Sequence, residues 1–146
     1  GPRGGAAMRL TVGPFDPALH VRSRDHHRAI CREAALLELP PDSTPRRWEA
    51  AVGRFYGRLA LAPVTEAVDR AFQAGKPRFA ADVTVPDEQV PAALHACLEL
   101  DRLLRELSRW ARQSDADVLS VPEDVHAYYA AFVAQARSQL EAPGRG

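Results

Sequence analysis

The longest uninterrupted helical pattern in the chain lies in residues 86–113, which read PDEQVPAALHACLELDRLLRELSRWARQ. Apolar residues recur there at steps of three and four, as one face of an amphipathic helix requires. This stripe consists of Ala93, Cys97, Leu100, Leu104, Leu107 and Ala111, and it is widened by Leu103 and Trp110. Charged residues occupy the opposite side, where Asp101 and Arg105 stand four apart and can pair. We therefore expect one continuous central helix over residues 86–113.

Shorter helical patterns lie on both sides of this stretch. Asp16 followed by Pro17 fits the N-cap and first position of a helix that runs to about residue 39. Prolines at a first turn, followed by apolar residues at helical spacing, predict further helices over residues 45–59, 63–72 and 122–140. Gly75 is the expected end of the helix that begins at 63, and Gly57 is a candidate end for the helix over 45–59.

Two segments have an extended rather than a helical pattern. Residues 8–15 alternate briefly between apolar and polar side chains, and residues 79–85 alternate around Thr84 as a connector or an edge strand would. We expect an all-α fold, a compact bundle of four to five helices with short extended connectors. The expected organisation is a tag remnant and extended lead-in over 1–15, one helical domain over 16–142 and a mobile tail over 143–146.

Composition excludes several classes of function. The 146 residues include 46% hydrophobic and 26% charged residues, which are ordinary values for one globular domain. Basic and acidic residues balance at 19 each, so no net field favours nucleic acid or an anionic membrane. No apolar run approaches the roughly 20 residues that span a bilayer. We expect a cytoplasmic protein whose two cysteines are free thiols.

Charge is nevertheless distributed unevenly along the chain. Residues 1–78 contain 13 Lys and Arg against 8 Asp and Glu, a net +5, whereas residues 79–146 contain 6 against 11, a net −5. Such asymmetry has two interpretations. It can mark a surface that binds a partner, or it can mean that two halves of one bundle face each other with opposite charge.

Residues that could perform chemistry are few. His26 and His27 are adjacent in the first helix, where their side chains diverge by about 100° and cannot readily chelate one ion. His27 and Cys31, four apart, make a better pair, but a zinc site needs three or four ligands and no ligand motif is present. The expected role of either histidine is a hydrogen bond to a neighbouring helix or loop. The sequence thus predicts a non-enzymatic protein without metal or cofactor.

Two sets of residues are candidates for binding. Partner contacts are expected from the basic face of the first helix and from the aromatic last helix, namely from Arg22, Arg24, Arg28, Tyr128 and Tyr129. The alternative is a small-ligand or metal sensor with its site between the first and long helices. In that alternative the polar contacts are His26, His27 and Arg32.

A family resemblance is carried by four segments in a fixed order. They are DHHRAICRE at 25–33, VTVP at 83–86, LDRLL at 100–104 and VLSVPEDV at 118–125. From about Val21 onward the chain resembles helical domains of actinobacterial signalling proteins that accompany ATP-binding modules of the anti-sigma-factor kinase type. The Ala- and Arg-rich composition, with Lys76 as the single lysine, agrees with such a source.

The resemblance implies a regulatory module that binds another signalling protein, such as a transcription regulator or its antagonist. This chain departs from the pattern in two respects. It has no ATP-binding module of its own, and its long helix ends in Trp110-Ala111-Arg112 where the related domains are more acidic and aromatic. A partner or ligand surface of the related domains is therefore expected to be altered here.

Overall fold

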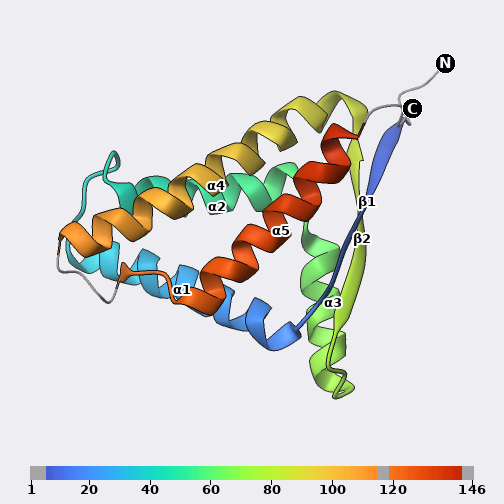
Figure 1. Cartoon of the computed structure of the whole chain (residues 1–146), viewed down its shortest axis with the longest axis horizontal. Coiled ribbons are helices and arrows are strands. Elements are labelled where there is room, and N and C mark those ends of the chain that lie inside the picture. The colour runs from blue at the N-terminus through green and yellow to red at the C-terminus, as the bar shows by residue number, and fades with distance from the viewer. Residues whose placement is uncertain (1–5, 115–118, 143–146) are drawn as a thin grey trace.

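Figure 1 shows the fold in a computed structural model, which describes residues 6–114 and 119–142. Within these residues, five α-helices and two strands follow one another along the chain. Their order is β1 (Ala7–Phe15), α1 (Pro17–Leu36), α2 (Thr44–Arg58), α3 (Ala62–Gln73), β2 (Phe79–Pro86), α4 (Val90–Gln113) and α5 (Glu123–Glu141). The strand pair and α3 form one side of the molecule, and the other helices extend from it.

The long helix α4 is continuous, but it begins later than its pattern suggested. Pro86 keeps an extended conformation as the last residue of β2, and Asp87–Gln89 form a single 3₁₀ turn before α4 starts at Val90. The predicted stripe from Ala93 to Ala111 is buried, which confirms the face that packs inward. α4 lies against α2 on one flank and α5 on the other.

The prediction of an all-α fold is wrong in one respect, because a small antiparallel sheet joins β1 to β2. Leu10 lies opposite Val83, and both side chains are buried in the core. The segment over residues 8–15 is therefore part of the domain rather than a lead-in to it. Gly13 is required in this strand, since its φ is +98° and a Cβ there would lie 2.6 Å from the carbonyl oxygen of Phe79.

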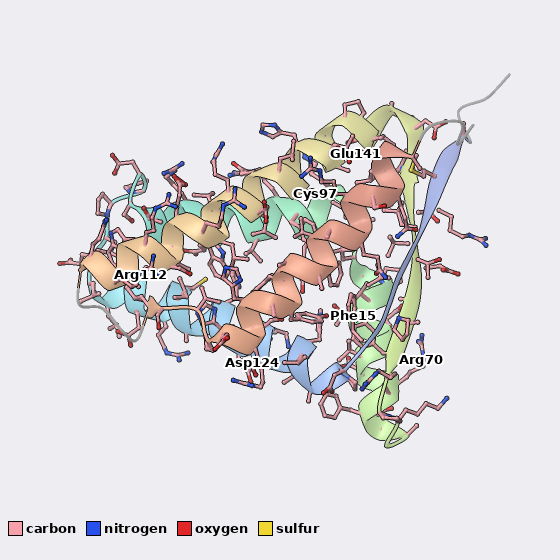
Figure 2. All side chains as sticks on the ribbon, viewed as in Figure 1. Phe15, Arg70, Cys97, Arg112, Asp124 and Glu141 are labelled. Carbon is pink, nitrogen blue, oxygen red and sulfur yellow. The ribbon has the colours of Figure 1, made fainter. Side chains whose placement is uncertain are left out.

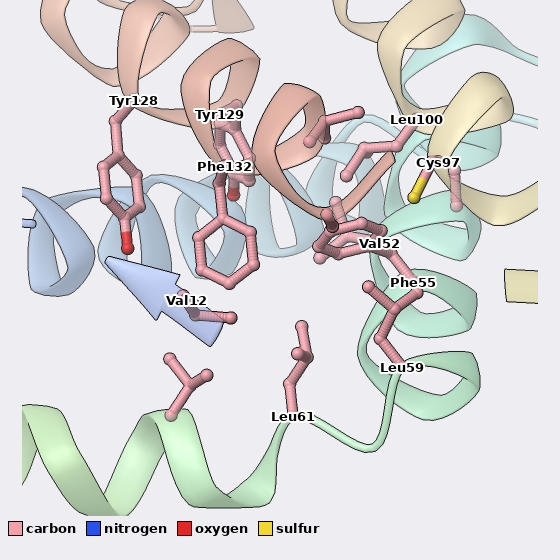
Figure 3. Packing of buried hydrophobic residues seen from close by; sticks show 14 of the residues in the cluster. Val12, Val52, Phe55, Leu59, Leu61, Cys97, Leu100, Tyr128, Tyr129 and Phe132 are labelled. Atoms are coloured by element: carbon pink, nitrogen blue, oxygen red, sulfur yellow. The ribbon is translucent and has the colours of Figure 1, made fainter. Parts of the chain in front are cut away.

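The core is built around aromatic side chains from α2 and α5. Figure 3 shows Tyr128, Tyr129 and Phe132 of α5 directed toward β1 and α2. Trp48 of α2 is fully buried, and its ring contacts that of Tyr129 edge-on at 5.7 Å. This is a favourable geometry for aromatic pairs, which contribute about 1 kcal/mol each beyond the area they bury.

Most predicted helix ends are confirmed. The Asp16 carboxylate accepts a hydrogen bond from the Ala18 amide as an N-cap, and Gly75 adopts the left-handed conformation after α3. Gly57, in contrast, lies inside α2, which ends one residue later at Arg58. Val118, the first residue of the segment VLSVPEDV, lies outside the described residues. Among the helices of the described part, none is both long and apolar enough to cross a membrane.

Ion pairs within the fold account for part of the uneven distribution of charge along the chain. Arginines of the first half meet carboxylates of the second half in three places: Arg22 with Asp124, Arg47 with Glu106, and Arg54 with Glu99. The last pair is bidentate, with both N···O distances at 2.8 Å, and Arg54 lowers the pKa of Glu99. The two halves of the bundle thus face each other with opposite charge.

Candidate functional site

A pocket of about 320 Å³ lies among α1, α2, α3 and α5. Six polar side chains line it: His20, Arg24, His27, Arg28, Tyr56 and Thr65. Val52, Gly53 and Tyr129 complete its wall. We call this the Arg24 pocket. It does not lie between the first and long helices, as the sequence suggested, because α2 packs against α4 and supplies the wall on that side.

At the inner end of the pocket, the imidazole of His20 contacts two tyrosine hydroxyls. Its side chain is 1% exposed, its Nδ1 lies 2.7 Å from the Tyr128 hydroxyl, and its Nε2 lies 3.4 Å from the Tyr56 hydroxyl. The Ser23 hydroxyl donates to the His20 carbonyl, and the Tyr129 hydroxyl donates to the Ser23 carbonyl. This network fastens α1 to α2 and α5 at the edge of the pocket.

Burial keeps these groups neutral near pH 7. It lowers the pKa of His20 to about 4, with a smaller effect in the same direction from Arg24 and an opposing one from Asp69. Burial also raises the pKa of Tyr56 to about 12 and raises that of Tyr128 further. A neutral imidazole has one donor and one acceptor nitrogen, so the chain from Tyr128 through His20 to Tyr56 has two possible directions.

The positive charge of the pocket comes from two arginines one helical turn apart. Within residues 6–114 and 119–142, neither Arg24 nor Arg28 forms an ion pair. The Nε atom of Arg24 is buried and has no hydrogen-bond partner there, which is unusual for a charged donor. Arg22, two residues earlier on α1, instead pairs with Asp124 on the surface.

The histidines singled out from the sequence have different surroundings. His26 lies away from the pocket, where its Nε2 donates to the Ser120 carbonyl at 3.0 Å and its ring packs edge-on against Trp48. This is the structural role expected for it. His27 does line the pocket, and its Nε2 lies 3.8 Å from the Cys31 sulfur. No group of three metal-ligating side chains occurs in the described part of the chain.

Three other predicted contact residues are placed differently from the expectation. Tyr128 and Tyr129 are 5% and 6% exposed, so they are core residues of the domain and cannot form the margin of a partner interface. The reason is that α5 turns this aromatic face toward α1, α2 and β1, where it fills the core. Arg32 is exposed on α1 and does not belong to the lining of the Arg24 pocket.

Sequence reasoning missed His20, Tyr56 and Thr65. A signal for His20 was present, because the buried stripe of α1 continues toward its start at helical spacing. At steps of three and four, the residues in this stripe that are buried or line the pocket are His20, Ser23, His27, Ile30 and Ala34. Three polar residues in line with two apolar ones indicate that this face of α1 packs in the core at one end and lines a polar site at the other.

Comparison of the chain with protein-family models, with curated proteins and with solved structures finds no match.

Proposed function

We propose that this chain is a non-enzymatic regulatory domain that binds a small organic anion in the Arg24 pocket. The observation that carries the proposal is Arg24, which lines the pocket and has, among the described residues, neither an ion-pair partner nor an acceptor for its buried Nε–H. Leaving such a donor unpaired costs about 1–3 kcal/mol or more. A bound carboxylate or phosphate ester would supply the missing acceptor and counter-charge.

The remaining lining suits the same class of ligand. Arg28 adds a second cation, and Thr65 and Tyr56 add hydroxyl groups. Val52 and the ring of Tyr129 provide apolar surface for the body of an organic ligand. The volume of about 320 Å³ lies at the small end of the range for ligand pockets.

One of the two directions of the hydrogen bonds through His20 favours an anionic ligand. When His20 Nδ1 accepts from Tyr128, its Nε2–H donates to Tyr56, and the Tyr56 hydroxyl then has its own proton free for the ligand. In the opposite direction Tyr56 would offer the ligand only a lone pair. A bound anion therefore favours the tautomer in which His20 carries its proton on Nε2.

The chemistry of the pocket supports binding rather than catalysis. His20, with a pKa lowered to about 4, is a poor base near neutral pH, and both its nitrogens face tyrosine hydroxyls. Burial raises the pKa of Cys31 to about 11, so its thiol stays protonated. The groups in and beside the pocket thus keep their protons or stay neutral under ordinary conditions.

The regulatory part of the proposal rests on the resemblance to helical domains of actinobacterial signalling proteins. On that basis we infer a cytoplasmic module that binds a neighbouring signalling protein, such as a transcription regulator or its antagonist. Occupation of a pocket framed by four helices would stabilise their packing and so bias the surface offered to that partner.

The proposal is tested by thermal denaturation in the presence of phenyl phosphate or benzoate, with benzylamine as the cation of similar size. A ligand that binds only the folded chain at about 100 times its Kd raises the free energy of unfolding by about 2.7 kcal/mol. For a domain of this size, that corresponds to a rise in Tm of about 5–10 °C. We expect the rise with an anion and none with benzylamine.

Matched variants identify the site. Arg24→Met should abolish the anion-induced rise, and Arg28→Met should reduce it, whereas Arg22→Met should leave it unchanged because Arg22 points to Asp124 instead. A rise of equal size in Arg24→Met, or the absence of any rise with either anion, would overturn the proposal.

A further inference from the structure

The two antiparallel strands have two outer edges, one on β1 and one on β2. On β1, two glutamines of α5 occupy the outer edge. The Gln139 amide accepts from the Thr11 amide and donates to the Thr11 carbonyl, both at 2.8 Å. The Gln135 amide likewise accepts from the Gly13 amide at 2.7 Å and donates to the Gly13 carbonyl at 2.9 Å. These side chains pair with β1 as a third strand would.

Among the residues that the structure describes, the outer edge of β2 has no such partner. Residues that face each other in an antiparallel pair direct their backbone groups the same way, either toward each other or both outward. Thr11 points outward to Gln139, so Asp82 opposite it points outward from β2, and Thr84, two residues on, does likewise. Within the described residues, no hydrogen bond from outside the strand pair reaches the backbone of Asp82 or Thr84.

A groove runs along β2 on the side of α3. It contains a pocket of about 520 Å³ beside the start of β2 and an adjoining one of about 310 Å³ further along. Small side chains of Ala67 and Ala71 on α3, and of Ala74 just after it, form one wall, and Ala80 lies on the strand side. Where α5 places glutamines at the edge of β1, α3 places small alanine side chains beside β2.

The groove is also positively charged at one end. Arg70, Lys76 and Arg78 line it, and Figure 2 labels Arg70 next to the strands. None of the three forms an ion pair within the described part of the chain. Asp82, at the other end, already accepts a hydrogen bond from the Thr11 hydroxyl.

From these observations we propose that the β2 groove binds an extended segment of a partner protein, which adds a strand to β2 and places acidic side chains near Lys76 and Arg78. Unpaired backbone groups select an extended peptide, because a strand edge is a template for another strand. The three cations select acidic side chains. The site lies apart from the Arg24 pocket, and its occupation does not depend on an anion there.

The test is a selection of random linear octapeptides, displayed on phage, against the folded chain. We expect enriched peptides to alternate β-branched and polar residues and to carry Asp or Glu at one end. In fluorescence polarisation, Lys76→Glu combined with Arg78→Glu should weaken binding of a selected peptide about tenfold or more. Arg112→Glu on α4 is the matched control and should bind as before, as should Arg24→Met.

Two further measurements test the strand addition itself. Thr84→Pro removes an outward N–H that does not bond to β1, so it should abolish peptide binding, while Thr84→Val should retain it. If Thr84→Pro fails to fold, hydrogen exchange on the unmodified chain tests whether the peptide pairs with β2. The amides of Asp82 and Thr84 should exchange freely in the absence of peptide and become protected with it. Failure to enrich acidic peptides, or bound peptide that leaves both amides unprotected, would overturn the proposal.

Discussion

The α5 side of the strand pair and its α3 side differ in how their polar groups are used. On the α5 side, Gln135 and Gln139 occupy the backbone groups of β1, and the buried tyrosine hydroxyls bond to α1. On the α3 side, no described residue outside the strand pair bonds to the outer edge of β2. The Arg24 pocket, among α1, α2, α3 and α5, likewise contains two cations that lack a counter-charge within the described residues. Polar groups with partners inside the chain support the fold. Those without partners indicate where another molecule binds.

The largest effect should come from protonation of His20, which lies between the two regions. Its pKa is about 4 in the folded chain and 6.5 in the unfolded chain, so the unfolded chain binds more protons between these values. The contribution of His20 to stability is therefore complete above pH 6.5 and falls by about 3 kcal/mol as the pH drops to 4. Urea denaturation across this range should show the loss, and His20→Gln should reduce it. A smaller loss should remain in that variant, because burial also lowers the pKa of His26 and of His27. An identical pH profile in that variant would show that His20 does not carry the effect.

A smaller loss is expected from Gln135→Leu, which leaves the amide and carbonyl of Gly13 without partners. The cost should be about 2 kcal/mol in the free energy of unfolding. The matched change on the α3 side is Thr84→Val, which removes no partner of the backbone and should stay within about 0.5 kcal/mol. Equal effects in chemical denaturation would mean that the two edges do not differ as described.

Removing the hydroxyl of each tyrosine beside His20 should lower the free energy of unfolding, measured by chemical denaturation, by different amounts. Tyr128→Phe removes the 2.7 Å contact with Nδ1 and should cost about 1.5 kcal/mol. Tyr56→Phe removes the 3.4 Å contact at the pocket and should cost about 0.5 kcal/mol. The reverse order would place the stronger hydrogen bond on the pocket side and contradict the distances around His20.

The smallest effect on stability is expected for the arginines of α1. Arg22→Met loses an exposed ion pair and should cost about 0.5 kcal/mol or less. Arg24→Met removes a buried donor without a partner and should leave the stability unchanged or slightly raised. A clear loss of stability in Arg24→Met would show that this side chain serves the fold rather than a ligand.

The helices and their inward faces could be predicted from the sequence, whereas the sheet and the pocket could not. Proline, glycine and apolar spacing act within a few residues, and they located α1 to α5 to within a few positions. The partner of Leu10 is Val83, which is 73 residues away, and no local pattern links them. The pocket likewise needs Arg24, Tyr56 and Thr65 from three helices. Only the stripe through His20, Ser23 and His27 indicates a polar site on α1.

The most direct test of the central claim is to observe the side-chain Nε–H of Arg24 by NMR during titration with phenyl phosphate. A new hydrogen bond to the anion should shift this proton and its nitrogen and slow the exchange of the proton with water, and Arg28 should respond more weakly. The Nε–H of Arg22 serves as the internal reference and should not change. Equal changes at Arg22 and Arg24, or no change at Arg24, would contradict an anion site in this pocket.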